Sequence, residues 1–351
     1  MRPIEPIHRA GQWFLRSGIQ EQGGGVARYH RSDLGRNAPV SNEITGYSVS
    51  TLLYLAARTG NPDYQTAAQR AGHYLVKHAW DSEARTFPFE PASNGSRLAY
   101  FFDCGIIVRG LTALAKVDGG NGAASAACAA AHSMARVFAA PTGWHPVLSL
   151  PACAPLPYEP RWSRQPGCYQ LKSALAWLET GDSSSYEAAL EFAFADEAGF
   201  LPGALEPERV MDRLHPYCYF LEGLLPVADR PEATRTLVSG IKRVECLLRE
   251  IAPAFARSDV YAQLLRVRLF ADALGAVPLD EAAAAEEAAA IPTFQVASDD
   301  PRTDGCFSFG RRLGELMPYA NPVSTAFCLQ AMEMWNDHRE NRFTSDWRTL
   351  I

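Results

Sequence analysis

The sequence contains no closely spaced pair of cysteines. Its eight cysteines are spread along 351 residues, and no C-x-x-C motif occurs. This spacing argues against a zinc ribbon, and in so long a chain it also argues against a disulfide framework. We expect free thiols, most of them buried, as in a protein of the reducing cytoplasm.

Long apolar runs and an excess of positive charge are also missing. No stretch approaches the ~18 to 20 apolar residues that cross a bilayer, and residues 1–20 contain neither the apolar core nor the cleavage site of a signal peptide. The 33 lysines and arginines stand against 39 aspartates and glutamates, a net charge of −6, which excludes a general electrostatic grip on nucleic acid. We expect a cytoplasmic protein with no membrane span and no nucleic-acid partner, present as a monomer or homodimer.

Several common catalytic motifs are absent as well. The sequence has no phosphate-binding G-x-x-x-x-G-K-[ST] loop, no H-E-x-x-H zinc motif and no G-x-S-x-G nucleophile turn. We expect neither a cofactor nor a metal site.

Helical periodicity runs through almost the whole sequence, in which 47% of the residues are hydrophobic. Residues 45–57 are apolar on nearly all sides, which indicates a buried helix, whereas residues 63–78 are apolar on one face only. A helix buried all round, followed by an amphipathic one, predicts an inner and an outer layer.

This pair of helices recurs along the chain. Inner helices are predicted to begin at Glu43, Asp103, Gly167, His215, Asp259 and Pro322. Outer helices are predicted at 123–139, 185–195, 232–251 and 279–290, with 5–16 as the outer partner of the last inner helix. We therefore predict an all-α fold, an (α/α)6 toroid of helical hairpins formed as a single domain of residues 1–351. Short β-hairpins or extended loops are expected at 25–30, 87–90 and 305–311, and an open helical solenoid is the alternative fold.

The predicted starts of the inner helices carry acids and aromatic residues. Such an acid can simply accept the free backbone N–H groups of the first turn, and we favour this interpretation for Asp259. For Glu43 and Asp103 the neighbouring aromatic residues favour a different one, because they would raise a carboxyl pKa by desolvation. Asp103 directly follows three aromatic residues at 100–102, so we expect it to be the general acid of a pair.

The order of these features resembles the unsaturated glucuronyl hydrolases and their six-hairpin relatives. The shared features are an acid on the first inner helix, a T-G-[ND]-x-x-Y turn and an acid that opens the next inner helix. The resemblance implies that Glu43 and Asp103 are catalytic and flank a uronic acid, although these hydrolases usually carry Asp at the first position. The sequence W-S-R-Q-P-G at 162–167 resembles their W-x-R-G-x-G element, which implies that Trp162 and Arg164 lie near the sugar. The chain also resembles the toroid domain of glucuronyl C5-epimerases, through G-G-V at 24–26 and the rhythm of its inner helices.

Sugars bind by stacking on aromatic rings, while arginine holds a carboxylate with two parallel hydrogen bonds. On these grounds the predicted substrate-binding residues are Arg28, Tyr47, Trp162, Arg164, His215, Tyr217, Tyr219 and Tyr261. We expect a concave cleft lined by Tyr47, Trp162, Tyr217 and Tyr219, although some of these rings could equally belong to the core.

These observations predict a carbohydrate-active enzyme that acts on a uronic-acid or other acidic glycan by general acid/base chemistry, as a hydrolase, lyase or epimerase. Its partner would be an acidic oligosaccharide or polysaccharide. One alternative is a non-catalytic glycan-binding or scaffold toroid in a bacterial polysaccharide pathway. A toroid that handles prenyl or terpenoid substrates is a further alternative, against which the polar helix starts and the missing aspartate-rich motif count.

Overall fold

The computed structural model describes residues 6–91, 97–119 and 121–351, and α-helices dominate this part of the chain. The helices are α1 (Pro6–Arg16), α2 (Asn42–Thr59), α3 (Pro62–Tyr74), α4 (Phe101–Asp118), α5 (Asn121–Val137), α6 (Gln170–Thr180), α7 (Ser183–Phe200), α8 (Pro207–Leu224), α9 (Pro231–Ile251), α10 (Ser258–Ala273), α11 (Glu281–Ala290) and α12 (Pro322–Arg339). The all-α prediction is therefore confirmed.

Nine short strands lie in the loops between the helices of the described part. They are β1 (His30–Arg31), β2 (Arg36–Asn37), β3 (Arg97–Tyr100), β4 (Val147–Leu150), β5 (Ala154–Pro155), β6 (Phe255–Arg257), β7 (Gly310–Arg312), β8 (Glu315–Leu316) and β9 (Tyr319–Ala320). The expected extended segments at 25–30 and 305–311 end in β1 and contain part of β7, whereas 87–90 forms an irregular loop.

The chain forms two compact units, each with its own set of packed helices. Unit 1 consists of Met1–Ser17, Tyr29–Arg36 and Ala198–Ile351, and unit 2 consists of Gly18–Arg28 and Asn37–Glu197. The single domain expected from the sequence stays a prediction.

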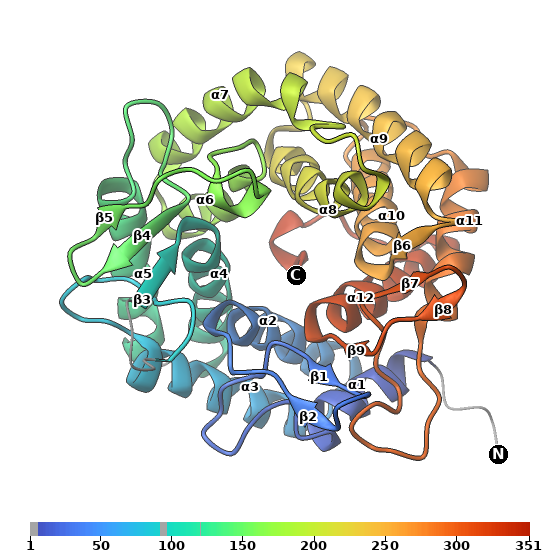
Figure 1. Cartoon of the computed structure of the whole chain (residues 1–351), viewed down its shortest axis with the longest axis horizontal. Helices are drawn as coiled ribbons and strands as arrows, with labels where there is room; N and C mark the ends of the chain where they lie inside the picture. Colours follow the sequence, from blue (N-terminus) through green and yellow to red (C-terminus); the bar gives the residue numbers. More distant parts are fainter. Residues whose placement is uncertain (1–5, 92–96, 120) are drawn as a thin grey trace. The chain divides into compact units, whose positions relative to one another are not determined.

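In unit 2, three buried helices form a row, and amphipathic helices cover it. Helix α4 packs against α2 and against α6, while α3 and α5 lie against the same side of this row (Figure 1). The first hairpin turns at Gly60, whose φ of 68° is the left-handed conformation that ends α2. Helices predicted at 45–57 and 63–78 are thus confirmed, as α2 and as α3 with the π-helical turn Leu75–Ala79.

Glycines allow the buried helices of unit 2 to approach backbone to backbone. A Cβ atom added at Gly110 of α4 would lie 2.6 Å from the carbonyl oxygen of Gly46 in α2. A Cβ atom added at Gly46 would in turn lie 2.9 Å from the Cα atom of Ile107. The distance between α2 and α4 is therefore set by main-chain contact.

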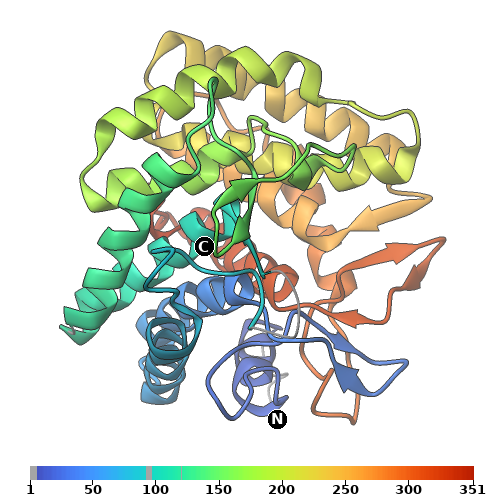
Figure 2. The ribbon, with the colours of Figure 1, turned by 60° about the vertical axis from the view of Figure 1, so that its left-hand side comes forward.

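Unit 1 repeats the plan with α8, α10 and α12 in a row and with α9, α11 and α1 packed against them (Figure 2). The N-terminal helix α1 contacts α12, as predicted for the outer partner of the last inner helix, and Glu5 lies outside the described residues. The β7–β8 hairpin projects from the ends of these helices (Figure 2).

One predicted helix start in unit 1 is wrong. Helix α8 begins at Pro207, so His215 and Pro216 lie inside it rather than at its first turn. Proline usually marks a helix boundary because it lacks an N–H group and crowds the preceding turn. Here burial of both neighbouring turns outweighs that cost, since the segment from Leu214 to Leu225 is buried throughout.

Two further properties concern the whole described chain. All eight cysteines are free thiols, and Cys128 and Cys246 are exposed while five others are buried. None of the helices in the described ranges is long and apolar enough to cross a membrane.

Candidate active site

The first turn of α2 holds Glu43. The Ser41 side chain caps this helix by accepting a hydrogen bond from the backbone N–H of Ile44 at 3.4 Å. A carboxylate in the first turn is favoured by the free N–H groups and the positive end of the helix dipole. Glu43 keeps part of its surface exposed, so solvent or a ligand can reach it.

The segment 26–28 forms hydrogen bonds to residues at the start of α2. The backbone N–H of Val26 donates to the hydroxyl of Thr45 at 2.9 Å, and the N–H of Ser41 donates to the Val26 carbonyl at 3.1 Å. The segment ends at Arg28. These bonds therefore bring the Arg28 side chain to the end of the helix that carries Glu43.

A second segment is attached to the same turn through Asn42. The backbone N–H of Asn42 donates to the carbonyl of Phe89 at 3.1 Å, and its side-chain amide donates to the carbonyl of Pro88 at 2.6 Å. Glu90 follows directly. Because Asn42 is itself fully buried, the position of this loop is fixed by α2.

Asp103 lies in the first turn of α4, which β3 enters without a loop. Its side chain belongs to the buried set, with 5% of the residue exposed. Within the described part of the chain, its Oδ2 atom is buried and has no hydrogen-bond partner. An ionised carboxylate in that position would be costly, so the geometry favours the protonated form.

The two acids influence each other across neighbouring helices. Burial raises the pKa of Asp103 well above its usual range, and the negative charge of Glu43 raises it further. Burial also raises the pKa of Glu43, to about 7, against the opposing positive charge of Arg28. The pair therefore combines a carboxyl group whose burial favours the protonated form with one that is close to its midpoint near neutral pH.

Two arginines and two aromatic rings lie beside the acids. The Arg28 guanidinium stacks 4.8 Å from the ring centre of Phe89, and the Arg164 guanidinium stacks 5.3 Å from that of Tyr100. The two rings contact each other with centres 5.4 Å apart. Arg28 also forms an ion pair with Glu90. We call these five residues the arginine–aromatic cluster.

Trp162 lies next to this cluster. It opens the 3₁₀ turn Trp162–Arg164, and its ring meets that of Tyr169 edge-on, with centres 5.1 Å apart. Trp162 is partly exposed. Burial raises the pKa of Tyr169, and the charge of the nearby Asp103 raises it further. The structure thus gathers Glu43, Asp103, Arg28, Trp162 and Arg164 into one region, and their roles in catalysis and binding stay predictions.

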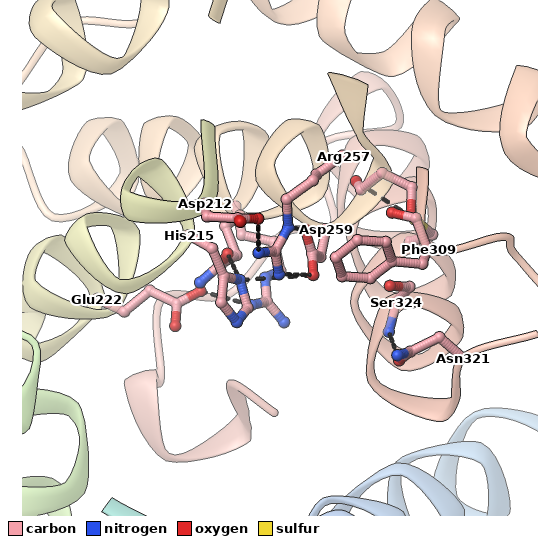
Figure 3. Close-up of polar contacts among 12 residues, drawn as sticks. Asp212, His215, Glu222, Arg257, Asp259, Phe309, Asn321 and Ser324 are labelled. Atoms are coloured by element: carbon pink, nitrogen blue, oxygen red, sulfur yellow. Dashed lines mark hydrogen bonds and ion pairs between the residues drawn. The ribbon is translucent and has the colours of Figure 1, made fainter. Parts of the chain in front are cut away.

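Unit 1 contains a polar cluster around His215 (Figure 3). The Nδ1 atom of His215 lies 2.7 Å from the amide oxygen of Gln263. Since an amide oxygen only accepts, Nδ1 carries the proton and Nε2 keeps its lone pair. Burial lowers the pKa of His215 to about 4, despite the nearby carboxylate of Asp259, so the imidazole is neutral near pH 7.

Asp259 differs from Asp103 because an arginine neutralises it. Arg257 bonds both carboxylate oxygens of Asp259, at 2.7 and 3.0 Å, and also Asp212 at 3.0 Å (Figure 3). Its guanidinium lies 4.4 Å from the ring centre of Phe309. Burial alone would raise the pKa of Asp259, but Arg257 outweighs it and the pKa is lowered.

The aromatic residues predicted to line a cleft are more buried than expected. Tyr47 and Tyr219 are each 2% exposed, and their contact with a sugar stays a prediction, as does that of the partly exposed Tyr261. The same holds for Tyr217, which is 1% exposed and whose ring lies against α9, where a Cβ atom added at Gly240 would meet it at 3.3 Å.

No protein-family model matches this chain, and no curated protein matches its sequence. Solved structures, by contrast, match its fold. Cellobiose 2-epimerase from Bacillus thermoamylovorans aligns with a TM-score of 0.70 at 10% identity, covering 92% of this chain and 95% of its own. A sugar epimerase from a ruminal bacterium aligns with a TM-score of 0.69 at 9% identity, covering 94% and 99%. An unsaturated glucuronyl hydrolase from a Bacillus species aligns with a TM-score of 0.61 at 14% identity, covering 95% and 96%.

The chain has the (α/α)6 toroid fold. The predicted fold class is thereby confirmed, and the solved structures that share it are carbohydrate-active enzymes. At these identities the likeness carries the fold and no residue roles.

Several residues of the two polar clusters were not predicted from the sequence. Phe89 and Glu90 lie in a segment that was expected only to be extended, and Gln263 lies within a buried helix. Their importance comes from partners far along the chain, such as Arg28 for Glu90. The F-P-F-E sequence at 87–90 offered a weak signal, because an acid beside aromatic residues also marks Asp103.

Metal ligation is not indicated. In the described ranges of the toroid, no group of three or more histidine, cysteine, aspartate or glutamate side chains could hold an ion.

Proposed function

We propose that this toroid is a carbohydrate-active enzyme that acts on a uronic-acid or other acidic glycan through Asp103 and Glu43. The observation that carries the proposal is the buried Oδ2 atom of Asp103, which has no hydrogen-bond partner among the described residues and lies next to a second acid with a raised pKa. Enzymes place such pairs where one group must give a proton and another must take one. The sugar epimerases and the glucuronyl hydrolase that share the fold support a sugar as the substrate.

The surroundings of the two acids suggest different roles for them. Asp103 is the more buried, and within the described residues its Oδ2 atom has no hydrogen-bond partner, so it would donate a proton as the general acid. Glu43 is partly exposed and close to the positive charge of Arg28. It would therefore act from the ionised state, either on the substrate or on a water molecule.

An acidic sugar fits the arginines of the region. Arg28 and Arg164 each rest on an aromatic ring and keep about a third and a fifth of their side chains exposed. A guanidinium held flat in this way presents a fork of donors that matches a carboxylate. Trp162 would add a ring on which a sugar face can stack.

Hydrolysis, elimination and epimerisation all require a proton donor and a proton acceptor at such a site. The experiment is a panel of saturated and unsaturated uronic-acid oligosaccharides, followed by NMR, which distinguishes cleavage, a new double bond and an inverted carbon. We expect turnover of at least one acidic glycan by the unmodified protein. Glu43→Gln and Asp103→Asn should each lower kcat by about 100-fold or more.

Asp63→Asn is the matched control, because Asp63 also lies in the first turn of a helix but belongs to the outer helix α3. It should keep full activity. Full activity in either amide variant of the pair would refute the assignment. Binding of glycans without any turnover would instead favour the non-catalytic, glycan-binding alternative.

A further inference from the structure

We propose that the Arg28 guanidinium is the binding site for the carboxylate of the sugar, and that Glu90 occupies this site in the free protein. The carboxylate of Glu90 then stands in for the substrate and must leave before an acidic sugar can bind. The inference rests on the proposed function for its substrate class, a sugar that bears a carboxylate.

The ion pair between Arg28 and Glu90 is open to exchange. Their side chains are 34% and 30% exposed, so a ligand can reach the pair, although the Oε1 atom of Glu90 that faces Arg28 is buried. In the described part of the chain, Arg28 is the one residue with which the Glu90 side chain interacts. No other contact within the described residues holds that carboxylate in place, and solvent can accept it when it leaves.

Arg28 itself is held much more firmly than Glu90. Its guanidinium rests on Phe89, and its backbone N–H donates to the carbonyl of Pro39 at 3.0 Å. Its Nε atom is buried and makes no hydrogen bond within the described residues. A carboxylate that replaces Glu90 and bonds the guanidinium with both of its oxygens would give this buried N–H donor a partner.

The position of Arg28 would place a bound sugar at the two acids. The segment that carries it is hydrogen-bonded to Ser41 and Thr45, on either side of Glu43 in the sequence. Its positive charge lowers the pKa of both Glu43 and Asp103. A carboxylate held by Arg28 thus brings the attached ring beside both acids.

The test measures equilibrium binding by titration calorimetry, independently of turnover. The probes are an unsaturated uronate disaccharide, under conditions or in an Asp103→Asn background that prevent turnover, and the methyl ester of the same disaccharide. Glu90→Gln keeps the shape of the side chain and removes the competing charge. We expect it to tighten binding of the free acid about fivefold, as for loss of one partly exposed ion pair, and to leave the ester within twofold.

Glu159→Gln is the matched control, since Glu159 is 57% exposed and lies 4.0 Å from the other arginine of the cluster, Arg164. It removes one negative charge from the same unit and should leave both affinities within twofold. Arg28→Met should abolish the preference for the acid over the ester.

Unchanged or weaker binding of the acid by Glu90→Gln would overturn the inference, because Glu90 would then support Arg28 rather than compete for it. An equal gain in Glu159→Gln would also overturn it and assign the effect to overall charge or to Arg164. Tighter binding in Glu90→Gln with no turnover of any glycan by the unmodified protein would refute the proposed enzyme and leave the binding site standing.

Discussion

Three acids in this protein occupy the same kind of position, the first turn of a buried helix, and only their partners distinguish them. Asp259 receives two hydrogen bonds from Arg257, and its pKa is lowered. Within the described residues Asp103 has no partner for its Oδ2 atom, and its pKa is raised. Glu43 lies between these cases, because Arg28 acts on it only at a distance. The sequence could place all three acids at helix starts, but it could not show which one an arginine neutralises.

The raised pKa of Glu43 predicts that this residue costs stability at neutral and alkaline pH. A carboxyl group with a folded-state pKa near 7 and an unfolded value near 4.5 favours folding when protonated. Glu43→Gln should therefore be more stable than the unmodified protein at pH 8, by about 1–2 kcal/mol after allowance for its partial exposure. The gain should shrink as the pH falls from 7 toward 4.5.

Urea unfolding at pH 8, 6 and 5 measures this difference. Asp103 and Arg28 face Glu43 in both proteins, and because the charge of Glu43 raises the pKa of Asp103, its removal adds to the stability gain at high pH. A stability gain that is independent of pH would show that packing, not ionisation, is the cause.

The lowered pKa of His215 predicts a neutral imidazole through the physiological range. Burial places this pKa at about 4, so its NMR signals should stay unchanged from pH 8 to 5 and should report a proton on Nδ1. Because the unfolded chain takes up this proton near pH 6.5, the stability contributed by neutral His215 is lost progressively as the pH falls from 6.5 toward 4. Titration near pH 6.5 would contradict the buried, Gln263-bonded arrangement.

At the scale of helices, periodicity alone predicted most elements because burial and sequence pattern agree in them. Helices α2, α9 and α12 begin within three residues of the predicted starts. The start of α8 was predicted wrongly because Pro216 suggested a helix boundary. In the structure Pro216 lies inside the helix, which the surrounding buried apolar residues keep intact. Close contacts such as that of Gly110 with Gly46 also escaped prediction, because they depend on which helices are neighbours.

Gly110→Ala should disturb the packing of α4 on α2. The added Cβ atom would lie 2.6 Å from the carbonyl oxygen of Gly46, so the helices must separate. We expect a loss of about 2–3 kcal/mol in unfolding free energy, with a matching fall in activity because Glu43 and Asp103 move apart. Thermal unfolding and kcat measure the two effects.

Gly119→Ala is the control for the intrinsic effect of glycine, since Gly119 caps the same helix and has nothing within 4 Å of an added Cβ. Its φ of 60° makes alanine cost about 1 kcal/mol. Activity should be kept. Equal losses in both variants would show that the helix contact is not tight.

At the scale of the whole molecule, each unit ties an extended segment to a helix through a threonine. The backbone N–H of Val26 donates to Thr45 in unit 2, and that of Phe307 donates to Thr325 in unit 1 at 3.0 Å. In each case the same hydroxyl donates to a carbonyl one turn earlier, at 2.7 and 2.8 Å. The fold class could be predicted because helical hairpins repeat in the sequence, whereas this shared attachment could not, since the two segments differ in most residues.

Thr45→Val and Thr325→Val should each cost about 1–2 kcal/mol of stability, because each leaves a buried N–H group without its acceptor. Only Thr45→Val should also weaken binding of the uronate disaccharide, since its segment carries Arg28. Chemical denaturation and titration calorimetry on both variants test this difference. Equal effects on binding would contradict the assignment of the carboxylate site to Arg28.

Because α2 and α4 are in main-chain contact, the distance between the two acids does not depend on the loops that surround them. Gly46 and Gly110 fix that spacing without any side chain, whereas Arg28, Glu90 and Arg164 all come from segments outside these helices. Substrate specificity can then change through changes in these loops, while the distance between Glu43 and Asp103 stays the same. For engineering, the loops are the part of this protein to redesign, and the glycine contact is the part to leave alone.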